Sequence, residues 1–250
     1  MSGIMPTKVS LIIPTLNEAE TIGRLIQSLN GIPELEIIVS DGGSADGTVQ
    51  QIIHSGVVAV QSKPGRGVQL NAGVQAASGN ILLFVHADSL LVVSAIAQIR
   101  QAVIRGAQWG CCQLKFEEET RFFRVLAKTS NWRARYLSMC YGDQGIYCTR
   151  NFFDSVGGFP DWAFLEDLEF SRRARRRVKA CVLKEQITTS TRRFRKHGLW
   201  RTFWKMQGVK VLFALGFPLP YIERFYRASG REKDVNGCHS HEQSSSAGQN

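Results

Sequence analysis

The chain has 250 residues, 44% of them hydrophobic, which is enough for one large α/β domain or for a domain with an appendage. Its 31 Lys and Arg residues exceed its 21 Asp and Glu residues, and the formal net charge of +10 favours anionic partners such as nucleotide phosphates, nucleic acid or an acidic membrane surface. No apolar run is long enough to cross a bilayer, residues 1–8 lack the apolar core of a signal peptide, and no cysteines are spaced C-x-x-C. We therefore expect a cytoplasmic protein with reduced thiols.

The first part of the chain alternates between apolar runs and helical patterns. Four apolar runs predict strands buried in a sheet, at residues 9–14, 35–39, 57–61 and 81–85. The segments between them predict helices. In the first of these segments, Asn17 suits an N-cap and residues 22–29 carry an apolar stripe at helical spacing. This alternation predicts an α/β fold with a mainly parallel central sheet flanked by helices.

The second half of the chain is less regular. Further helices are expected at residues 92–105, 120–139, 166–177, 199–213 and 220–227, the last two amphipathic. Strands are expected at residues 108–116 and 143–148, and a helical turn at 152–156. Beyond residue 229 the chain has few apolar residues, which is typical of a disordered tail.

Polar side chains follow the predicted strands directly. His86 and Asp88 come after the fourth strand and are two residues apart, so their side chains can share one side and hold a divalent cation that carries a phosphate. Opening the next turn is the simpler role for this pair. Asp41 follows the second strand, where a carboxylate can bind a base or ribose, and Glu18 could do so from the first loop. Turn capping and a favourable charge at a helix start are the alternatives for these two residues.

Lys63 and Arg66 flank Gly65 and Gly67, so cations stand beside backbone that a phosphate can approach closely. The glycine pattern supports a dinucleotide site only weakly, because Leu70 occupies the last position of the usual fingerprint.

The adjacent carboxylates Glu166 and Asp167 follow a segment rich in aromatic residues. Such carboxylates suit general-base work in a partly dry pocket. The alternative is a favourable charge at a helix start, which contributes only about 0.3–1 kcal/mol.

Together, these motifs resemble glycosyltransferase family 2 and its GT-A (nucleotide-diphospho-sugar transferase) fold over roughly Val9 to Arg195. The motifs, in order, are Ile-Ile-Pro-Thr-Leu-Asn-Glu (12–18), Ser-Asp-Gly-Gly-Ser-Ala-Asp-Gly-Thr (40–48), Gly-Arg-Gly-Val-Gln-Leu-Asn-Ala-Gly (65–73), His-Ala-Asp (86–88), Gly-Asp-Gln-Gly-Ile (142–146) and Gly-Gly-Phe-Pro…Leu-Glu-Asp-Leu-Glu (157–169). Within the family, the chain looks like the small bacterial branch labelled selenium- or radical-SAM-associated, whose members are often named after carotenoid (diaponeurosporenoate) glycosyltransferases.

The resemblance implies an inverting transfer of a sugar from a nucleotide-sugar donor to an acceptor hydroxyl or carboxyl. Pro14, Glu18 and Asp41 match positions that hold the base and ribose. Arg66 matches the loop that faces the diphosphate, and Lys63 precedes it in the same loop.

Asp88 matches the last Asp of the family's D-x-D metal motif, and Asp167 matches the catalytic base of its E-D motif, in which Glu166 precedes it. His86 stands where many relatives have Asp, and imidazole suits Mn²⁺ better than Mg²⁺. We expect residues 142–144 between donor and acceptor, with Asp143 and Gln144 as substrate-binding candidates. A strand-opening turn is the alternative role for Asp143.

From these matches we divide the chain into a GT-A catalytic domain at 1–198, an amphipathic helical appendage at 199–228 and the tail at 229–250. The catalytic domain has a nucleotide-sugar half at about 1–115 and an acceptor half at about 116–198. The cations and aromatic residues of 192–205 suit either peripheral contact with the inner face of a membrane, with a lipid-linked or apolar acceptor, or a helix packed on the sheet.

Two other functions remain open at this point. A nucleotidyltransferase can use a similar sheet and metal, but it needs a glycine-rich phosphate loop after the first strand, and residues 14–17 are not one. A non-catalytic nucleic-acid-binding protein would fit the charge and the aromatic residues, but it has no need for Asp41, Asp88 and Asp167 at strand ends. We therefore do not expect a nucleic-acid partner.

Overall fold

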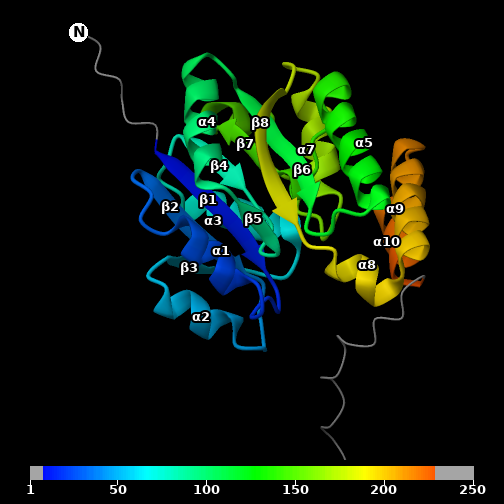
Figure 1. Cartoon of the computed structure of the whole chain (residues 1–250), viewed down its shortest axis with the longest axis horizontal. Helices are drawn as coiled ribbons and strands as arrows, with labels where there is room; N and C mark the ends of the chain where they lie inside the picture. Colours follow the sequence, from blue (N-terminus) through cyan, green and yellow to red (C-terminus); the bar gives the residue numbers. More distant parts are fainter. Residues whose placement is uncertain (1–7, 229–250) are drawn as a thin grey trace, which may run out of the picture. The chain divides into compact units, whose positions relative to one another are not determined.

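The computed structural model describes residues 8–228. Within them, one eight-stranded sheet has the order β3-β2-β1-β4-β7-β6-β8-β5 (Figure 1). Its strands are β1 (Val9–Thr15), β2 (Leu35–Asp41), β3 (Val58–Gln61), β4 (Ile81–Phe84), β5 (Ser89–Leu91), β6 (Trp109–Phe116), β7 (Ile146–Thr149) and β8 (Cys181–Thr189). The helices are α1 (Ile22–Leu29), α2 (Thr48–His54), α3 (Arg66–Ala76), α4 (Val93–Ile104), α5 (Arg121–Leu137), the 3₁₀ helix η1 (Gly142–Gln144), α6 (Arg150–Ser155), α7 (Glu166–Ala174), α8 (Arg192–His197), α9 (Leu199–Ala214) and α10 (Leu219–Ala228).

The sheet confirms the predicted α/β class and adds antiparallel pairings in its second half. β3, β2, β1 and β4 are parallel neighbours, and β6 and β8 are also parallel. β7 runs antiparallel between β4 and β6, and β5 pairs antiparallel with β8. The parallel strands β1, β2 and β4 therefore end at the same edge of the sheet, where open α/β sheets bind ligands.

Alternate residues of the central strands pack into two separate cores. Leu11 and Leu83 belong to a core shared with α1 and α4, whereas Ile12 and Leu82 belong to a core shared with α3, α6 and α7. Both faces of these strands are buried, which explains why their apolar runs are continuous. In the second core, the Phe159 ring packs edge-on against Phe84 at 4.8 Å.

The structure corrects the prediction at two turns. Asn17 does not cap the first helix, because α1 begins at Ile22 and Asn17 has φ of 57°, in the left-handed region. The strand expected over residues 143–148 begins only at Ile146, because residues 142–144 form η1.

β5, β8 and α8 are not predicted from the sequence pattern. In β8, Lys184 and Glu185 interrupt the apolar residues, so the segment lacks a clear strand signal. Glu185 accepts a hydrogen bond from Gln98 Nε2 of α4 at 2.7 Å, which accommodates this polar side chain within a strand.

The described part of the chain divides into two units between residues 191 and 192, whereas the sequence places the boundary at 198/199. Of the second unit, residues 192–228 are described, and there α9 packs against α10. Gly208 lies against the Phe225 ring, and Lys205 Nζ stands 4.2 Å from the centre of the Tyr226 ring. Among the described helices, none combines the length and the apolar character that crossing a membrane requires. The disorder expected for residues 229–250 lies outside the described residues.

Glu36 of β2 ties the turn before β4 to the first two strands. Its carboxylate accepts hydrogen bonds from Ser10 Oγ and from the backbone N–H groups of Ser78 and Gly79, and it lies 2.9 Å from Lys8 Nζ. Burial raises the pKa of Glu36, but the bonds from Ser10, Ser78 and Lys8 outweigh burial and lower the pKa to about 2.

A Glu36→Gln variant tests this anchor. Because the folded-state pKa is depressed, its stabilisation is complete above the ordinary carboxyl pKa of 4.5 and is lost as the pH falls toward 2. We expect the variant to lose about 1–3 kcal/mol of unfolding free energy at pH 7 and the gap from wild type to close below pH 4, measured by urea denaturation. The variant Glu34→Gln, at an exposed position of the loop before β2, should match wild type throughout. If the difference in unfolding free energy between Glu36→Gln and wild type were the same at every pH, the ionised Glu36 carboxylate would not be the anchor.

Candidate active site

Loops at the ends of β1 and β2 are bonded together into one rim. Asn17 N donates to Ser44 Oγ at 2.8 Å, and Asn17 Oδ1 accepts from Ala45 N at 2.9 Å. Glu18 N donates to Thr48 Oγ1 at 2.9 Å. The left-handed backbone of Asn17 places its side chain and its N–H on the second loop, so the two strand ends present a single fixed surface.

Asp41 shapes the turn after β2. Its side chain accepts from Gly43 N at 2.9 Å, from Ser44 N at 2.8 Å and from the hydroxyls of Ser44 and Thr15. Burial raises the pKa of Asp41, but these bonds, first those from Ser44, lower it overall, so the carboxylate is ionised near neutral pH. Four donors use the acceptor capacity of one carboxylate, which supports the turn-capping role. A contact between Asp41 and a base or ribose stays a prediction.

Three other predicted donor-binding residues lie along the same rim. Pro14 is buried in β1 opposite Ser40 of β2. Glu18 is half-buried and accepts from Thr21 Oγ1 at 2.9 Å. Lys63 is exposed in the loop between β3 and α3.

Gln69 of α3 is a structural residue of the site that the sequence motifs do not single out. Its Nε2 donates to Thr15 O at 2.6 Å and to Ser40 O at 3.0 Å, and its Oε1 accepts from Gly65 N at 3.3 Å. The side chain is 3% exposed and lies against Gly42, where an added Cβ would meet its amide at 3.1 Å. One buried amide thus fixes the ends of β1 and β2 to the loop before α3. The Gly-Arg-Gly-Val-Gln order contains this residue, but no periodicity reveals its role.

Glu166 lies at the first position of α7 and is fully buried, and its Oε1 stands 3.1 Å from Arg66 Nε at the start of α3. Burial raises the pKa of Glu166 to about 7; the Arg66 cation opposes this shift, and the neighbouring Asp167 carboxylate adds to it. The structure therefore joins two predicted site residues that are far apart in the sequence.

Asp167 points away from that pair, toward η1. It is 8% exposed, and its Oδ2 accepts from Gly142 N at 2.7 Å while its Oδ1 accepts from Leu168 N at 2.8 Å. At Gly142 an added Cβ would lie 2.5 Å from His86 Nε2 and 3.4 Å from Asp167 Oδ2. Glycine is therefore required where the imidazole and this carboxylate meet the 3₁₀ turn.

His86 stands among charged side chains from four segments. Burial and the Arg66 cation lower the pKa of its imidazole, and the carboxylates of Asp88, Asp143 and Asp167 oppose them. Because the net direction is downward from 6.5, the ring is neutral at pH 7. These interactions place Arg66, Asp88, Asp143 and Asp167 around one imidazole at the end of β4.

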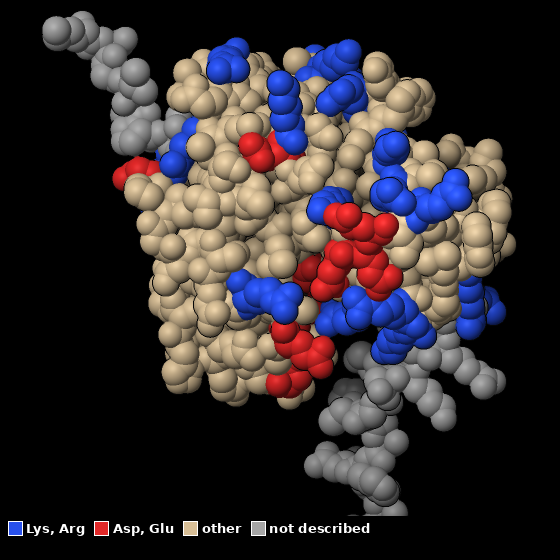
Figure 2. Space-filling view, in the orientation of Figure 1, with Lys and Arg blue, Asp and Glu red and all other residues tan. Residues whose placement is uncertain are grey.

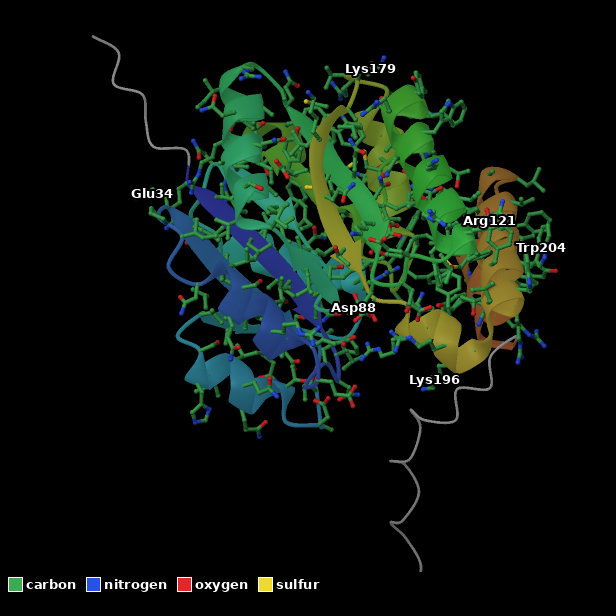
Figure 3. The ribbon with its side chains drawn as sticks, in the orientation of Figure 1. Glu34, Asp88, Arg121, Lys179, Lys196 and Trp204 are labelled. Atoms are coloured by element: carbon green, nitrogen blue, oxygen red, sulfur yellow. The ribbon has the colours of Figure 1, made fainter. Side chains whose placement is uncertain are left out.

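Asp88, which is labelled in Figure 3, is half-buried. It borders a pocket at the same edge of the sheet. The pocket is lined by Glu20, Thr21, Arg24, residues 87–90, Glu117 and residues 188–190. Figure 2 shows Asp and Glu side chains gathered on this face of the molecule.

Among residues 8–228, no three or more His, Cys, Asp or Glu side chains form a complete metal-binding group. Asp88 and His86 can therefore supply only part of a cation's ligands.

Gln144 does not lie where a substrate contact would place it. The side chain is fully buried, and its Oε1 accepts from Arg133 Nη2 at 2.8 Å and from Tyr141 N at 3.2 Å. The amide therefore holds η1 in place from the inside. Asp143, one residue earlier, is half-buried within the group of charges around His86.

Comparison with known proteins gives one family and several distant relatives. The sequence model of glycosyl transferase family 2 matches residues 10–159. The "Glucosyl-3-phosphoglycerate synthase" of Mycolicibacterium smegmatis is 33% identical over 93 residues, which are 32% of this chain and 30% of that protein. "Glycosyltransferase AglJ" of Haloferax volcanii is 38% identical over 71 residues, which are 28% of this chain and 23% of that protein. The match thus spans less than a third of the length of these relatives.

Two solved structures share the fold at low sequence identity. Mannosyltransferase PcManGT from Pyrobaculum calidifontis, in complex with GDP-Man and Mn²⁺, has a TM-score of 0.65 and 20% identity, covering 89% of this chain and 69% of that one. Glucosyl-3-phosphoglycerate synthase from Mycobacterium tuberculosis, in complex with Mn²⁺, UDP and phosphoglyceric acid, has a TM-score of 0.60 and 20% identity, covering 85% and 80%. These similarities confirm the expected GT-A fold.

A Gln69→Leu variant tests the clamp on the rim. It removes the donors to Thr15 O and Ser40 O and leaves both carbonyls buried, so we expect a loss of about 1–3 kcal/mol of unfolding free energy. Faster amide hydrogen exchange at residues 42–44 should accompany this loss. Gln75→Leu, at an exposed position of the same helix, serves as the matched control and should change neither quantity. If Gln69→Leu and Gln75→Leu had the same unfolding free energy and the same exchange rates at residues 42–44, Gln69 would not hold the two strand ends together.

Proposed function

The chain belongs to glycosyl transferase family 2, and on that premise we propose that it transfers a sugar from a nucleotide-sugar donor to an acceptor hydroxyl or carboxyl. One observation carries the proposal. At the end of β4, His86 interacts with the Arg66 cation and with the carboxylates of Asp88 and Asp167, and these groups come from three separate segments. A cation and carboxylates at one strand end suit a diphosphate leaving group on one side and a proton acceptor on the other.

The donor would lie along the rim formed by the β1 and β2 loops. The order Pro14, Glu18 and Asp41 follows that rim, and Arg66 at the start of α3 would meet the diphosphate. Two solved proteins of similar fold carry GDP-Man or UDP together with Mn²⁺, which supports a nucleotide-sugar donor here.

A divalent cation fits the donor set of this site if the diphosphate contributes ligands of its own. Asp88 offers a carboxylate, His86 a neutral imidazole, and the described residues hold no complete ligand group without the donor. A bound cation would neutralise charge on the departing diphosphate. The mixed oxygen and nitrogen ligands favour Mn²⁺ over Mg²⁺.

Asp167 would act as the general base. Two backbone N–H groups, from Gly142 and Leu168, fix its carboxylate, and it is buried beside the neutral His86. It would take the proton from the acceptor hydroxyl, whose oxygen attacks the anomeric carbon from the face opposite the leaving group. Glu166 is held against Arg66. In this proposal Asp167 therefore takes the proton, and the configuration at the anomeric carbon would invert.

A lipid-like acceptor and peripheral membrane contact are supported by the second unit. Trp200, Trp204 and Val211 follow at helical spacing along α9 and are 61%, 66% and 56% exposed. Between residues 192 and 228, Glu223 is the only acidic residue in the sequence, whereas basic residues are frequent. An apolar stripe flanked by cations is the composition of a helix that lies at an anionic membrane surface. We place the protein in the cytoplasm, at the inner face of the membrane.

Asp167→Asn and Asp88→Ala separate the two chemical roles. The proteins are incubated with Mn²⁺ and UDP-glucose or GDP-mannose, and we follow thermal shift and release of nucleoside diphosphate. We expect Asp167→Asn to keep the donor-induced thermal shift and to lose about 10²–10⁴-fold in turnover. Asp88→Ala should lose the Mn²⁺-dependent part of the shift. Asp154→Asn, at an exposed position of α6, is the control. Wild-type turnover in Asp167→Asn would overturn the base assignment.

The double variant Trp200→Ala/Trp204→Ala tests the membrane contact. Wild type should float with liposomes that contain phosphatidylglycerol, and flotation should weaken as the salt concentration rises. The double variant should float less at every salt concentration. Trp132→Ala, which removes an exposed tryptophan of α5, should float like wild type. Flotation that is absent, or that does not depend on these tryptophans, would remove the membrane proposal.

A further inference from the structure

Adjacent carboxylates at the start of α7 point to different partners. Glu166 reaches back to Arg66 of α3, whereas Asp167 reaches forward to Gly142 of η1. The same dipeptide therefore touches the segment that would bind the donor and the segment that surrounds the reacting centre. This division of contacts suggests separate roles for two residues that the sequence motif presents as one pair.

The start of α3 is fixed against the segment that leads into α7. Gly67 N donates to Trp162 O at 2.9 Å, and a Cβ at Gly67 would lie 1.9 Å from Pro160 O, so no other residue allows this approach. Asn71 Nδ2 donates to Phe159 O and to Asp161 Oδ1, each at 2.9 Å. Arg66 and Glu166 thus face each other across a backbone contact that leaves little room for either helix start to move.

The environments of the two charges differ strongly. The Glu166 side chain is 1% exposed and the Arg66 side chain 34%, so the ion pair runs from the interior to the surface. Among residues 8–228, neither Glu166 oxygen has a hydrogen-bond partner in another residue, so this buried carboxylate depends on the Arg66 cation. Such a pair contributes little to stability compared with apolar packing, which points to a role in directing the guanidinium.

We propose that Glu166 is a positioning residue that holds Arg66 toward the donor's diphosphate, so that donor recognition is tied to the helix that carries Asp167. This inference rests on the proposed function and refines it. Glu166 neither takes the acceptor's proton nor touches the sugar. It acts through Arg66, whose Nε it faces, while the exposed part of that side chain meets the donor.

The ionisation of Glu166 should make donor affinity depend on pH. Arg66 of α3 and Asp167 of α7 are the charged groups that act on Glu166, and burial places its pKa at about 7. Only the ionised carboxylate holds the guanidinium, so donor affinity should rise as the pH increases from 6 to 8. If Arg66 instead left Glu166 to bind the diphosphate, the buried carboxylate would take up a proton and donor affinity would fall over the same range. His86 has a pKa lowered below 6.5, so it titrates mainly below this window.

The test is a double-variant cycle of Arg66→Gln and Glu166→Gln, read by calorimetry with Mn²⁺ and either UDP-glucose or GDP-mannose, and with inorganic pyrophosphate as a second ligand. We expect Arg66→Gln to weaken binding about 10–100-fold and Glu166→Gln about tenfold, from the strength of charged hydrogen bonds. The double variant should bind no more weakly than Arg66→Gln alone, because Glu166 acts only through Arg66. Michaelis constants should rise more than turnover falls.

Glu169→Gln is the matched control, since Glu169 lies on the same helix and pairs with Arg172 and Arg173. It should leave donor affinity unchanged. The pH series uses a nucleotide-sugar, because its charge is constant between pH 6 and 8. In Glu166→Gln, donor affinity should no longer change with pH over this range. If Glu166→Gln fails to fold, the pH series of the wild type is sufficient. Donor affinity that rises with pH indicates that Glu166 holds Arg66 in the complex, and affinity that falls indicates that Arg66 leaves Glu166.

Additive losses in the cycle, or wild-type affinity that falls or stays level from pH 6 to 8, would overturn the inference while leaving sugar transfer intact. Absence of nucleotide-sugar turnover in wild type would count against the proposed function itself. In that case the pyrophosphate cycle still measures whether Glu166 acts through Arg66.

Discussion

The close approach of α3 to the segment before α7 is the constraint on which the site depends. Gly67 allows a backbone contact that any side chain would block, and Asn71 adds bonds to residues 159 and 161. These contacts bring Arg66, at the start of α3, and Glu166 and Asp167, at the start of α7, to the same end of the sheet. Without that approach, the carboxylates of Glu166 and Asp167 would not lie beside the rim formed by the strand-end loops.

Local packing gives each carboxylate of the site a different character. Asp41 accepts four hydrogen bonds, and its pKa falls despite burial. Glu166 is buried against the Arg66 cation, and its pKa rises to about 7. Asp167 is held by two backbone N–H groups. The same carboxylate group thus shapes a turn at Asp41, pairs with a cation at Glu166 and is fixed by backbone N–H groups at Asp167. The number and kind of donors around each carboxylate determine these differences.

The fold class and the family can be predicted from the sequence because their signals are local, whereas the roles of the site residues stay predictions. Continuous apolar runs identify β1, β2 and β4, and the ordered motifs identify the family. Gln69 and Gln144 escaped correct interpretation because their roles depend on partners distant in the chain or on burial, which no spacing encodes. The prediction for Asn17 was wrong for a related reason. Its side chain suits an N-cap, but in the structure its Oδ1 accepts a hydrogen bond from Ala45 N in the loop after β2. β8 was missed because its polar residues find partners only after folding.

The central claim is that separate strand-end turns meet on one metal-bound diphosphate, with Asp167 across from it. The most direct measurement is a crystal structure of the chain with Mn²⁺ and UDP or GDP. The account predicts that Mn²⁺ is bound by the Asp88 carboxylate and by diphosphate oxygens, with Arg66 on the diphosphate and the nucleoside along the β1–β2 rim. A nucleotide bound elsewhere, or bound here with Asp88 turned away from the ion and Arg66 out of reach of the phosphates, would contradict it.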